Sequence, residues 1–347
     1  MTADDRFCPP LGPAAPAGTM TERSQPTLPF QVVRDGSAGA LRGAVVAIGN
    51  FDGVHGGHRA VIAAALSRAS ALGRPAAALT FEPHPRSFFR LDEPLFRLTD
   101  ERAKLRLLAA TGLSGAIVLT FDAALAALTA EDFVANILVR RLAVSGVVIG
   151  FDFHFGAERQ GSPAFLAAAG TKRGFAVDIV PRFENQGRPV RSGPIRAALA
   201  AGEVKEAAEL LGYPWFVSGE VLHGDKRGRA LGFPTANLRL DPACGLKHGI
   251  YAVRVGIGGR RYDGVASFGR RPMFAASFPL LEVFLFDFAG DIYGEAIDVA
   301  FIAWIRPELK FDSVDALVAR MHEDSALART ALARSGGAFP PLGAVAG

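Results

Sequence analysis

Two histidines in the first third of the chain are spaced so that both could contact one phosphate group. They lie in the segment Gly49–His58, which reads GNFDGVHGGH and separates an apolar run from a helix-like one. A glycine-rich turn lets backbone amides approach an anion, and the N-terminus of the following helix adds positive potential. His55 and His58, with two residues between them, could both donate to that phosphate. Metal ligation would also use histidines, but no third ligand type lies nearby in the sequence. The segment therefore predicts a nucleotide-binding turn.

A second segment with phosphate-binding chemistry, Val221–Asn237, lies in the C-terminal half. It combines glycines, which permit close approach, with cations that suit phosphate. Thr235 and Asn237 are two residues apart, so on an extended strand they face the same side. Their hydroxyl and amide oxygens are hard donors that suit Mg²⁺. The run Pro-Thr-Ala-Asn alone would more often be a plain loop, but the whole block indicates a binding site.

The first segment lies in a region where apolar runs alternate with helix-like runs, from Ala44 to about Gly212. This alternation predicts a parallel sheet covered on both faces, which binds ligands at the carboxyl ends of its strands. We expect Thr99 and Ser162 to cap two of the helices. The expected strands are Ala44–Ile48, Ala76–Phe81, Ala116–Thr120, Val147–Ile149 and Phe175–Val180. The expected helices are Arg59–Leu72, Asp100–Ala110, Glu131–Leu142, Pro163–Thr171, Ile195–Ala201 and Val204–Leu211.

After Tyr213 and Pro214 the pattern changes to a series of strands with a single closing helix, Ser313–Ala333. Gly258 and Gly259 between two of the strands indicate a hairpin. A run of antiparallel strands with one helix predicts a small barrel or sandwich. The expected strands are Phe216–Leu222, Thr235–Leu240, Tyr251–Ile257, Arg261–Ser267, Leu281–Asp287 and Ile297–Ile305.

Bulk composition fits two ordinary globular domains in 347 residues. The net charge of +4 is spread along the chain, with no basic stripe of the kind that nucleic-acid binding requires. Two cysteines suit a reducing cytoplasm, and no run approaches the roughly 18 apolar residues of a membrane span. We expect a disordered tail at 1–29, domains at 30–213 and 214–336, and a flexible tail at 337–347. Protein partners are not indicated.

The first segment closely resembles the N-terminal signature of bacterial bifunctional riboflavin kinase/FAD synthetases, within the nucleotidylyltransferase superfamily. Thr80–Pro85 and Gly150–Gly156 agree with the same family in order and spacing. The resemblance implies a Rossmann-like α/β domain in which His55 and His58 stabilise charge on the α-phosphate of ATP while FMN attacks. The nucleotide- and flavin-binding residues that it implies here are Gly49, Asn50, Phe51, Gly53, Asp152, Phe155, Arg159, Ser192 and Arg196.

One departure from the family falls at Arg191–Arg196. The family usually has a Ser-Ser-Thr-x-Ile-Arg run at the start of this helix, where it holds ATP phosphates. Here Arg191 stands in place of a serine and Gly193 in place of the threonine. Two hydroxyl donors are lost and one guanidinium is gained, which either replaces the donors or obstructs the site.

The second segment resembles the riboflavin kinase signature of the same family. The resemblance implies Mg²⁺ held by Thr235 and Asn237, and Glu282 as the base that accepts the proton of the riboflavin 5′-hydroxyl. Glu282 is also the lone acid in an otherwise apolar strand stretch. The ATP- and flavin-binding residues implied are Gly224, Lys226, Gly228, Gly232, Phe233 and Arg306. Ser267 and Met273 depart from the Asn and Thr that the family tends to have, and we expect them to tune substrate contacts.

These features together predict a multifunctional enzyme that uses riboflavin, FMN and ATP with Mg²⁺, and that binds neither nucleic acid nor membrane. The expected chemistry is phosphorylation of riboflavin in the C-terminal domain and adenylylation of FMN to FAD in the N-terminal one. Three alternatives remain at this point. They are a kinase with weak or lost adenylyltransferase activity, a non-catalytic flavin- or nucleotide-binding regulator, and an adenylyltransferase for another small phosphate ester such as a pyridine mononucleotide.

Overall fold

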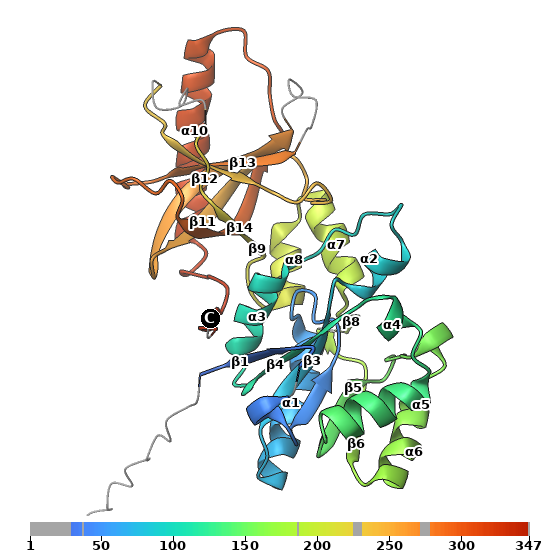
Figure 1. The fold of residues 1–347 in the computed structure, drawn as a ribbon. Helices are drawn as coiled ribbons and strands as arrows, with labels where there is room; N and C mark the ends of the chain where they lie inside the picture. Colours follow the sequence, from blue (N-terminus) through green and yellow to red (C-terminus); the bar gives the residue numbers. More distant parts are fainter. Residues whose placement is uncertain (1–28, 37, 186, 225–230, 271–277, 346–347) are drawn as a thin grey trace, which may run out of the picture.

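The computed structural model describes residues 29–345 except 37, 186, 225–230 and 271–277. Figure 1 shows an α/β domain, coloured blue to yellow-green, beside a domain coloured yellow to red. No helix among the described residues is long and apolar enough to cross a membrane.

The first domain is built on a six-stranded parallel sheet, as the alternating pattern predicts. Its strand order is β1-β4-β3-β2-β5-β6. Helices cover both faces, so β2 and most of β3 are buried. The strands are β1 (Gln31–Arg34), β2 (Val45–Ile48), β3 (Ala76–Glu82), β4 (Gly115–Thr120), β5 (Gly146–Gly150) and β6 (Ala176–Val180). β1 was not expected from the sequence, because it is a short edge strand that is only partly buried.

The helices of this domain follow the predicted order. They are α1 (Gly56–Leu72), α2 (Pro85–Phe89), α3 (Glu101–Ala109), α4 (Ala123–Ala126), α5 (Ala130–Asp132), the π-helical η2 (Phe133–Arg141), α6 (Pro163–Arg173), α7 (Ser192–Ala201) and α8 (Val204–Leu211). Two 3-10 turns, η1 (Gly39–Leu41) and η3 (Ala157–Arg159), and a small hairpin of β7 (Glu184–Asn185) and β8 (Arg188–Pro189) complete it.

Two predicted helix caps have different outcomes. Ser162 caps α6 by accepting a hydrogen bond from the Phe165 amide at 3.1 Å, which confirms the prediction. The prediction for Thr99 was wrong, because Asp100 caps α3 through the Ala103 amide at 2.6 Å. The Thr99 hydroxyl instead accepts a hydrogen bond from the backbone of Gly53, 46 positions earlier in the chain.

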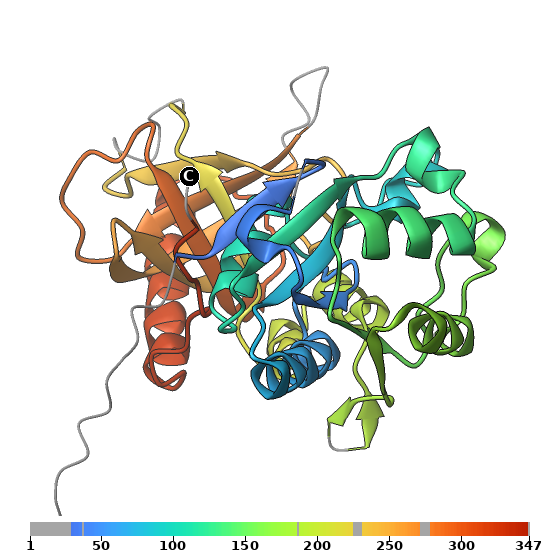
Figure 2. The same ribbon diagram turned by 60° about the horizontal axis from the view of Figure 1, so that its bottom comes forward.

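The second domain is a six-stranded antiparallel sheet, with strand order β10-β13-β12-β11-β14-β9, that nearly closes into a barrel (Figure 2). Its edges meet where the Leu222 amide donates to the carbonyl of Asn237 at 2.8 Å. Gly258 and Gly259 form the β11–β12 turn with φ values of 53° and 80°, which confirms the predicted hairpin. The elements are β9 (Phe216–Glu220), β10 (Thr235–Arg239), β11 (Gly249–Ile257), β12 (Arg260–Arg270), β13 (Pro279–Leu285), β14 (Ala296–Arg306) and α10 (Val314–Ala333).

The two domains pack tightly against each other. Arg106 of α3 forms a bidentate ion pair with Asp298 of β14, with N–O distances of 2.6 and 2.7 Å. The indole of Trp215 donates to the Leu98 carbonyl at 2.8 Å, and one buried apolar cluster continues through both domains. The segment after α10, for which the sequence predicts a flexible tail, lies in the structure against both domains. Its Gly343 amide donates to the Arg106 carbonyl at 2.9 Å.

Candidate active sites

The segment Gly49–His58, here called the histidine loop, connects β2 to α1 at the carboxyl end of the parallel sheet. Its backbone is strained, because Phe51 and Val54 have positive φ values of 50° and 36°. A β-branched residue such as Val54 adopts this conformation only where its surroundings impose it. The loop conformation must therefore be held by contacts from elsewhere in the fold.

Those contacts come from distant parts of the chain and converge on Asp52. The buried Asp52 carboxylate accepts the Thr99 amide at 3.0 Å and pairs with the Arg196 guanidinium at 2.5 Å. The Ser192 hydroxyl donates to the Asp52 carbonyl at 3.2 Å, and the Tyr213 hydroxyl donates to the next carbonyl, that of Gly53, at 2.6 Å. Ser192 and Arg196, predicted as nucleotide ligands, thus anchor the histidine loop in this structure.

The two histidines of the loop form a stacked pair. His55 caps α1, its Nδ1 accepting from the His58 amide at 3.4 Å, and the two ring centroids lie 3.7 Å apart. Burial lowers the pKa of His55 to about 4 and lowers the pKa of His58 well below its usual value. Both rings are therefore neutral at neutral pH, so each can offer one N–H donor but no positive charge.

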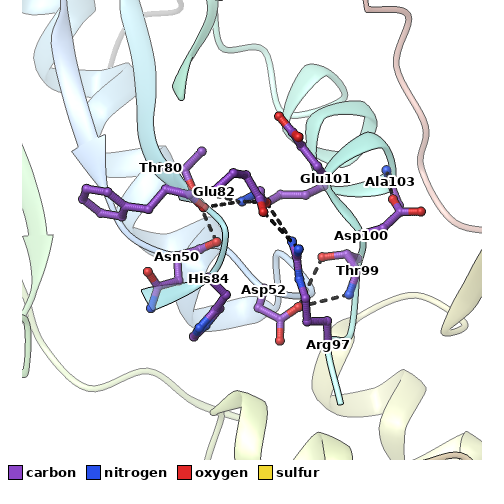
Figure 3. A network of polar contacts seen from close by, with 12 residues as sticks. Asn50, Asp52, Thr80, Glu82, His84, Arg97, Thr99, Asp100, Glu101 and Ala103 are labelled. Atoms are coloured by element: carbon purple, nitrogen blue, oxygen red, sulfur yellow. Dashed lines mark hydrogen bonds and ion pairs between the residues drawn. The ribbon is translucent and has the colours of Figure 1, made fainter. Parts of the chain in front are cut away.

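A buried polar network supports the loop from beneath (Figure 3). The Lys104 ammonium of α3 contacts the Glu82 carboxylate at 2.6 Å and the Thr80 hydroxyl at 3.2 Å. The Thr80 hydroxyl in turn donates to the Asn50 carbonyl at 3.3 Å. Burial would raise the pKa of Glu82, but Lys104 and Arg97 outweigh it and the pKa falls below the usual value. Lys104 and Arg97 therefore hold the Glu82 carboxylate between two cations beside the loop.

Sequence reasoning missed this network. Lys104 lies among the apolar positions of α3, with a side chain that is 2% exposed, and a lysine in an apolar helical stripe was the available signal. A third imidazole also faces the site from the predicted motif Thr80–Pro85. His84 caps α2 through the Arg86 amide at 3.1 Å, and burial lowers its pKa to about 4.

The histidine loop opens onto a cavity of about 1320 Å³. Predicted site residues that line it are Gly49, Asn50, Phe51, His55, His58, Asp152, Phe155, Arg159 and Ser192. Gly53 and Arg196 lie behind its wall, where Gly53 packs on Leu98 and Leu211. Aromatic and cationic side chains make up much of the remaining lining: Phe81, Phe89, Phe121, Phe133, Phe151, Phe153, Phe183, Arg86, Arg90, Arg182 and Arg191. The cavity thus offers an apolar wall for a flat ring system and several guanidinium groups for phosphates.

Arg191, where the sequence departs from the family pattern, lies at the wall of this cavity. Its guanidinium lines the cavity, half exposed, with Nη2 3.9 Å from the Asp152 carboxylate. A side chain at Gly193 would meet nothing within 4 Å of its Cβ, so the lost threonine leaves open space. The two substitutions therefore add a cation at the cavity wall and remove two hydroxyls, one at position 191 and one at position 193.

In the second domain, strand register brings the predicted kinase residues together. Asn237 of β10 lies directly opposite Glu282 of β13, and Glu282 lies opposite Ser267 of β12. Directly opposed residues point to the same face of a sheet, so the three side chains form a row across three strands. Thr235 lies two residues before Asn237 on the same face.

The loop before this row also approaches it closely. A Cβ on Gly224 would lie 2.4 Å from the Asn237 amide nitrogen, so a side chain at position 224 would displace the Asn237 side chain. Gly232 adopts a φ of 84° at the turn into β10. Phe233 packs edge-on against Phe284 of β13 at 4.9 Å. The predicted ligands Lys226 and Gly228 lie outside the described residues.

Arg306, predicted as a flavin ligand, is occupied by protein groups. It is buried at the end of β14 and pairs with Asp324 of α10 through two contacts of 2.8 and 2.5 Å. Its third nitrogen donates to the Pro307 carbonyl at 2.8 Å. In this structure Arg306 therefore fastens α10 to the barrel.

The fold and the two candidate sites are those of a two-domain phosphate-transfer protein, with a histidine-containing loop on a parallel sheet and a row of oxygen donors on a barrel. The family model for FAD synthetase matches residues 38–193, and that for riboflavin kinase matches residues 211–332. The chain belongs to the family of bifunctional riboflavin kinase/FMN adenylyltransferases.

Relatives with that name come from several bacteria. The protein of Escherichia coli K12 is 41% identical over 288 residues, which cover 83% of this chain and 92% of the relative. That of Pseudomonas fluorescens is 42% identical over 295 residues, which cover 85% and 94%. A solved structure described as a macrolide-efflux protein from Streptococcus pneumoniae shares the fold, with a TM-score of 0.77 and 33% identity over 86% of this chain and 99% of that one.

Proposed function

We propose that this chain makes FAD from riboflavin in two ATP-dependent steps, with Glu282 acting in the first and His55 and His58 in the second. The observation that carries the proposal is that two family models match successive parts of one chain, residues 38–193 and residues 211–332. The kinase step comes from the barrel and the adenylyl transfer from the α/β domain.

In the kinase step, the riboflavin 5′-hydroxyl attacks the γ-phosphate of ATP, giving FMN and ADP. Glu282 accepts the hydroxyl proton as the new O–P bond forms. Its placement opposite Asn237 supports this role, because the strands fix the carboxylate beside the residues proposed to bind the metal. Gly224 and Gly232 would give the phosphates close access to the backbone, and Lys226 and Gly228, which lie outside the described residues, are assigned to the same ligand. Phe233 is assigned to the flavin side of the same site.

The residues of this row fit a magnesium ion. Thr235 and Asn237 supply a hydroxyl and an amide oxygen, which are the hard donors that Mg²⁺ prefers, and Glu282 directly opposite Asn237 adds a carboxylate to the row. When bound, Mg²⁺ would neutralise phosphate charge in the transition state. Arg306 would act at a distance, by fixing α10 against β14 through Asp324.

In the adenylylation step, a phosphate oxygen of FMN attacks the α-phosphate of ATP and pyrophosphate leaves. Catalysis is positioning and electrostatics, with no covalent enzyme intermediate. The neutral His55 and His58 rings donate N–H groups to the α-phosphate. Positive charge comes from guanidinium groups of the cavity wall, among them Arg159 and Arg191. The main-chain groups of Gly49, Asn50 and Phe51 border the nucleotide, and Phe155 supports the ring-binding wall.

The kinase-only alternative keeps one specific observation in its favour, the exchange at Arg191 and Gly193. A regulator that only binds its ligands would not need Glu282 opposite Asn237 together with a paired His55 and His58, so the complete sets favour an enzyme.

Chromatography of flavins after incubation with Mg-ATP tests the proposal. Riboflavin should yield FMN and then FAD, and supplied FMN should yield FAD. If riboflavin stops at FMN and supplied FMN is untouched, the chain is a kinase whose first domain is inactive. Retention of flavin without any ATP turnover would instead identify a regulator.

A further inference from the structure

A cleft of about 370 Å³ lies where three segments from different parts of the chain meet. Helix α3 of the α/β domain forms one side. The β11–β12 turn and the start of β14 form another, and residues 339–342 of the C-terminal segment form the third. Among the described residues, the cleft shares no lining residue with the adenylylation cavity or with the row Asn237, Glu282 and Ser267.

The cleft is strongly cationic. Four arginines line it, Arg102 and Arg106 from α3 and Arg260 and Arg261 from β12, against one carboxylate, that of Asp298. That carboxylate is already saturated. It takes both contacts from Arg106, and the Ser218 hydroxyl donates to it at 2.6 Å. Asp298 therefore balances Arg106 and leaves the other three arginines uncompensated.

Two of these arginines are available to a ligand. The third, Arg261, packs against Phe339, with its guanidinium carbon 4.8 Å from the centroid of that ring. Arg102 and Arg260 are exposed and have no hydrogen-bond or ion-pair partner within the part of the chain that the structure describes. Arg102 belongs to the α/β domain and Arg260 to the barrel, so an anion bound between them would contact both domains. Beside them, Gly258 and Gly259 leave the turn without side chains, and a Cβ added at either glycine would meet nothing within 4 Å.

We propose that this cleft is a third binding site, which takes a small molecule carrying a diphosphate group. Guanidinium groups bind phosphate oxygens in pairs, and two of them facing one cleft suit a group with several such oxygens. The volume is at the lower end of the roughly 300–1000 Å³ of small-molecule sites, so it accommodates a group of nucleotide size or smaller. Inorganic pyrophosphate and nucleoside diphosphates share this chemistry.

Helix α3 connects the cleft to the histidine loop. Arg102 and Arg106 face the cleft, while Lys104 on the same helix holds Thr80 and Glu82 beneath the loop. Thr99, just before the helix, holds Asp52 and Gly53. A ligand in the cleft would therefore contact the same nine-residue helix that supports the adenylylation site.

Equilibrium dialysis of the full-length protein against labelled pyrophosphate, and separately against labelled ADP, tests the proposal at physiological salt. The double variant Arg102→Ala with Arg260→Ala should bind one equivalent fewer per chain than the unmodified protein. The control, Arg140→Ala with Lys172→Ala, removes the same charge from two exposed positions outside the cleft and should lose none. Thermal unfolding of both variants would verify that they are folded.

The two probes separate the sources of the diphosphate. If the cleft variant loses an equivalent of both probes, the cleft recognises the diphosphate group itself. Loss of ADP binding alone shows that the nucleoside contributes. Loss of pyrophosphate binding alone shows a site for the inorganic ion. Equal binding by the unmodified protein and the cleft variant would overturn the proposal, as would an equal loss in the control. The difference of one equivalent does not depend on how many ligands the catalytic sites take, so this result is independent of the proposed enzyme activity.

Discussion

The two candidate active sites are positioned by different physical means. In the α/β domain, a strained loop is held by Thr99 just before α3, by Arg196 of α7 and by Tyr213 at the domain boundary, all of which converge on Asp52 and Gly53. In the barrel, backbone hydrogen bonds between β10, β13 and β12 set the row of Asn237, Glu282 and Ser267. A loop held by side chains moves when an anchor is removed, whereas strand register survives the loss of one side chain. The structural effect of a substitution should therefore extend further in the first site than in the second.

The largest effect should come from Glu282→Gln, which removes the proposed base without disturbing strand pairing. Loss of a general base costs about 10²–10⁴-fold in rate, so FMN formation from riboflavin should fall by at least about 100-fold. FAD formation from supplied FMN should stay within about twofold of wild type. The matched control Glu323→Gln changes an exposed acid of α10 and should alter neither rate. FMN formation at the wild-type rate would show that Glu282 is not the base.

Low pH should specifically lower the stability of the α/β domain, which contains the histidine loop. Burial lowers the pKa of His55 to about 4, so between pH 6.5 and pH 4 the unfolded chain binds a proton that the folded chain does not. Stability is therefore complete above pH 6.5 and is lost as pH falls towards 4. The difference of about 2.5 between the unfolded and folded pKa amounts to on the order of 3 kcal/mol from His55 alone.

Urea unfolding at pH 7 and pH 4, followed by circular dichroism, measures this loss. His55→Gln should lose less stability over the same interval than the unmodified protein does. His248→Gln, in an exposed part of the barrel, should behave as wild type. The same loss in all three proteins would mean that His55 is not buried in its neutral form.

Arg196→Ala sharpens the comparison between the two sites, because it removes an anchor of the histidine loop that does not line the cavity. The Asp52 carboxylate would keep only its Thr99 contacts, and the loop would lose a charge-assisted bond of about 1.5–3 kcal/mol. FAD formation from FMN should fall about 10- to 100-fold, with the kinase rate unchanged. Arg196→Lys should restore part of the activity if anchoring is the cause. A loss of both activities would mean that the substitution unfolds the protein and does not act through the loop.

The smallest expected effect is that of Arg191→Ser with Gly193→Thr, which returns the helix start to the family pattern. Because Arg191 lines the cavity and Gly193 has open space beside it, both side chains fit. If Arg191 replaces the lost hydroxyl donors, FAD formation should change by no more than about threefold, which is under 1 kcal/mol. An increase of more than about tenfold would favour the kinase-only alternative. Initial rates with supplied FMN give the answer.

Much of the fold could be predicted from the sequence, because its signals are local. Alternating apolar runs predicted the parallel sheet, and the Gly258–Gly259 pair predicted a hairpin that the structure contains. The histidine loop was also found from residue types and spacing. The sequence did not predict contacts between residues that are far apart in the chain. Thr99 was expected to cap a helix but binds Gly53 across the fold, and a partner 46 positions away leaves no mark in the local pattern.

The same reason explains the site residues whose surroundings were not foreseen. Arg196 and Arg306 were predicted as ligands from the family resemblance, but their partners Asp52 and Asp324 could be found only in three dimensions. Lys104 was missed because its apolar neighbours gave no sign of Glu82 and Thr80. In contrast, Asn237 and Glu282 lie on predicted strands, and only their direct opposition required the structure.

The central claim is that two separate sites in one chain act in series, and mixing two inactive variants tests it most directly. Glu282→Gln should be unable to convert riboflavin to FMN, and His58→Ala should make FMN but not FAD. Each alone, supplied with riboflavin and Mg-ATP, should therefore yield no FAD. The mixture should yield FAD, because FMN released by the His58 variant is adenylylated by the Glu282 variant. Absence of FAD from the mixture, when each variant retains its other activity, would contradict the account.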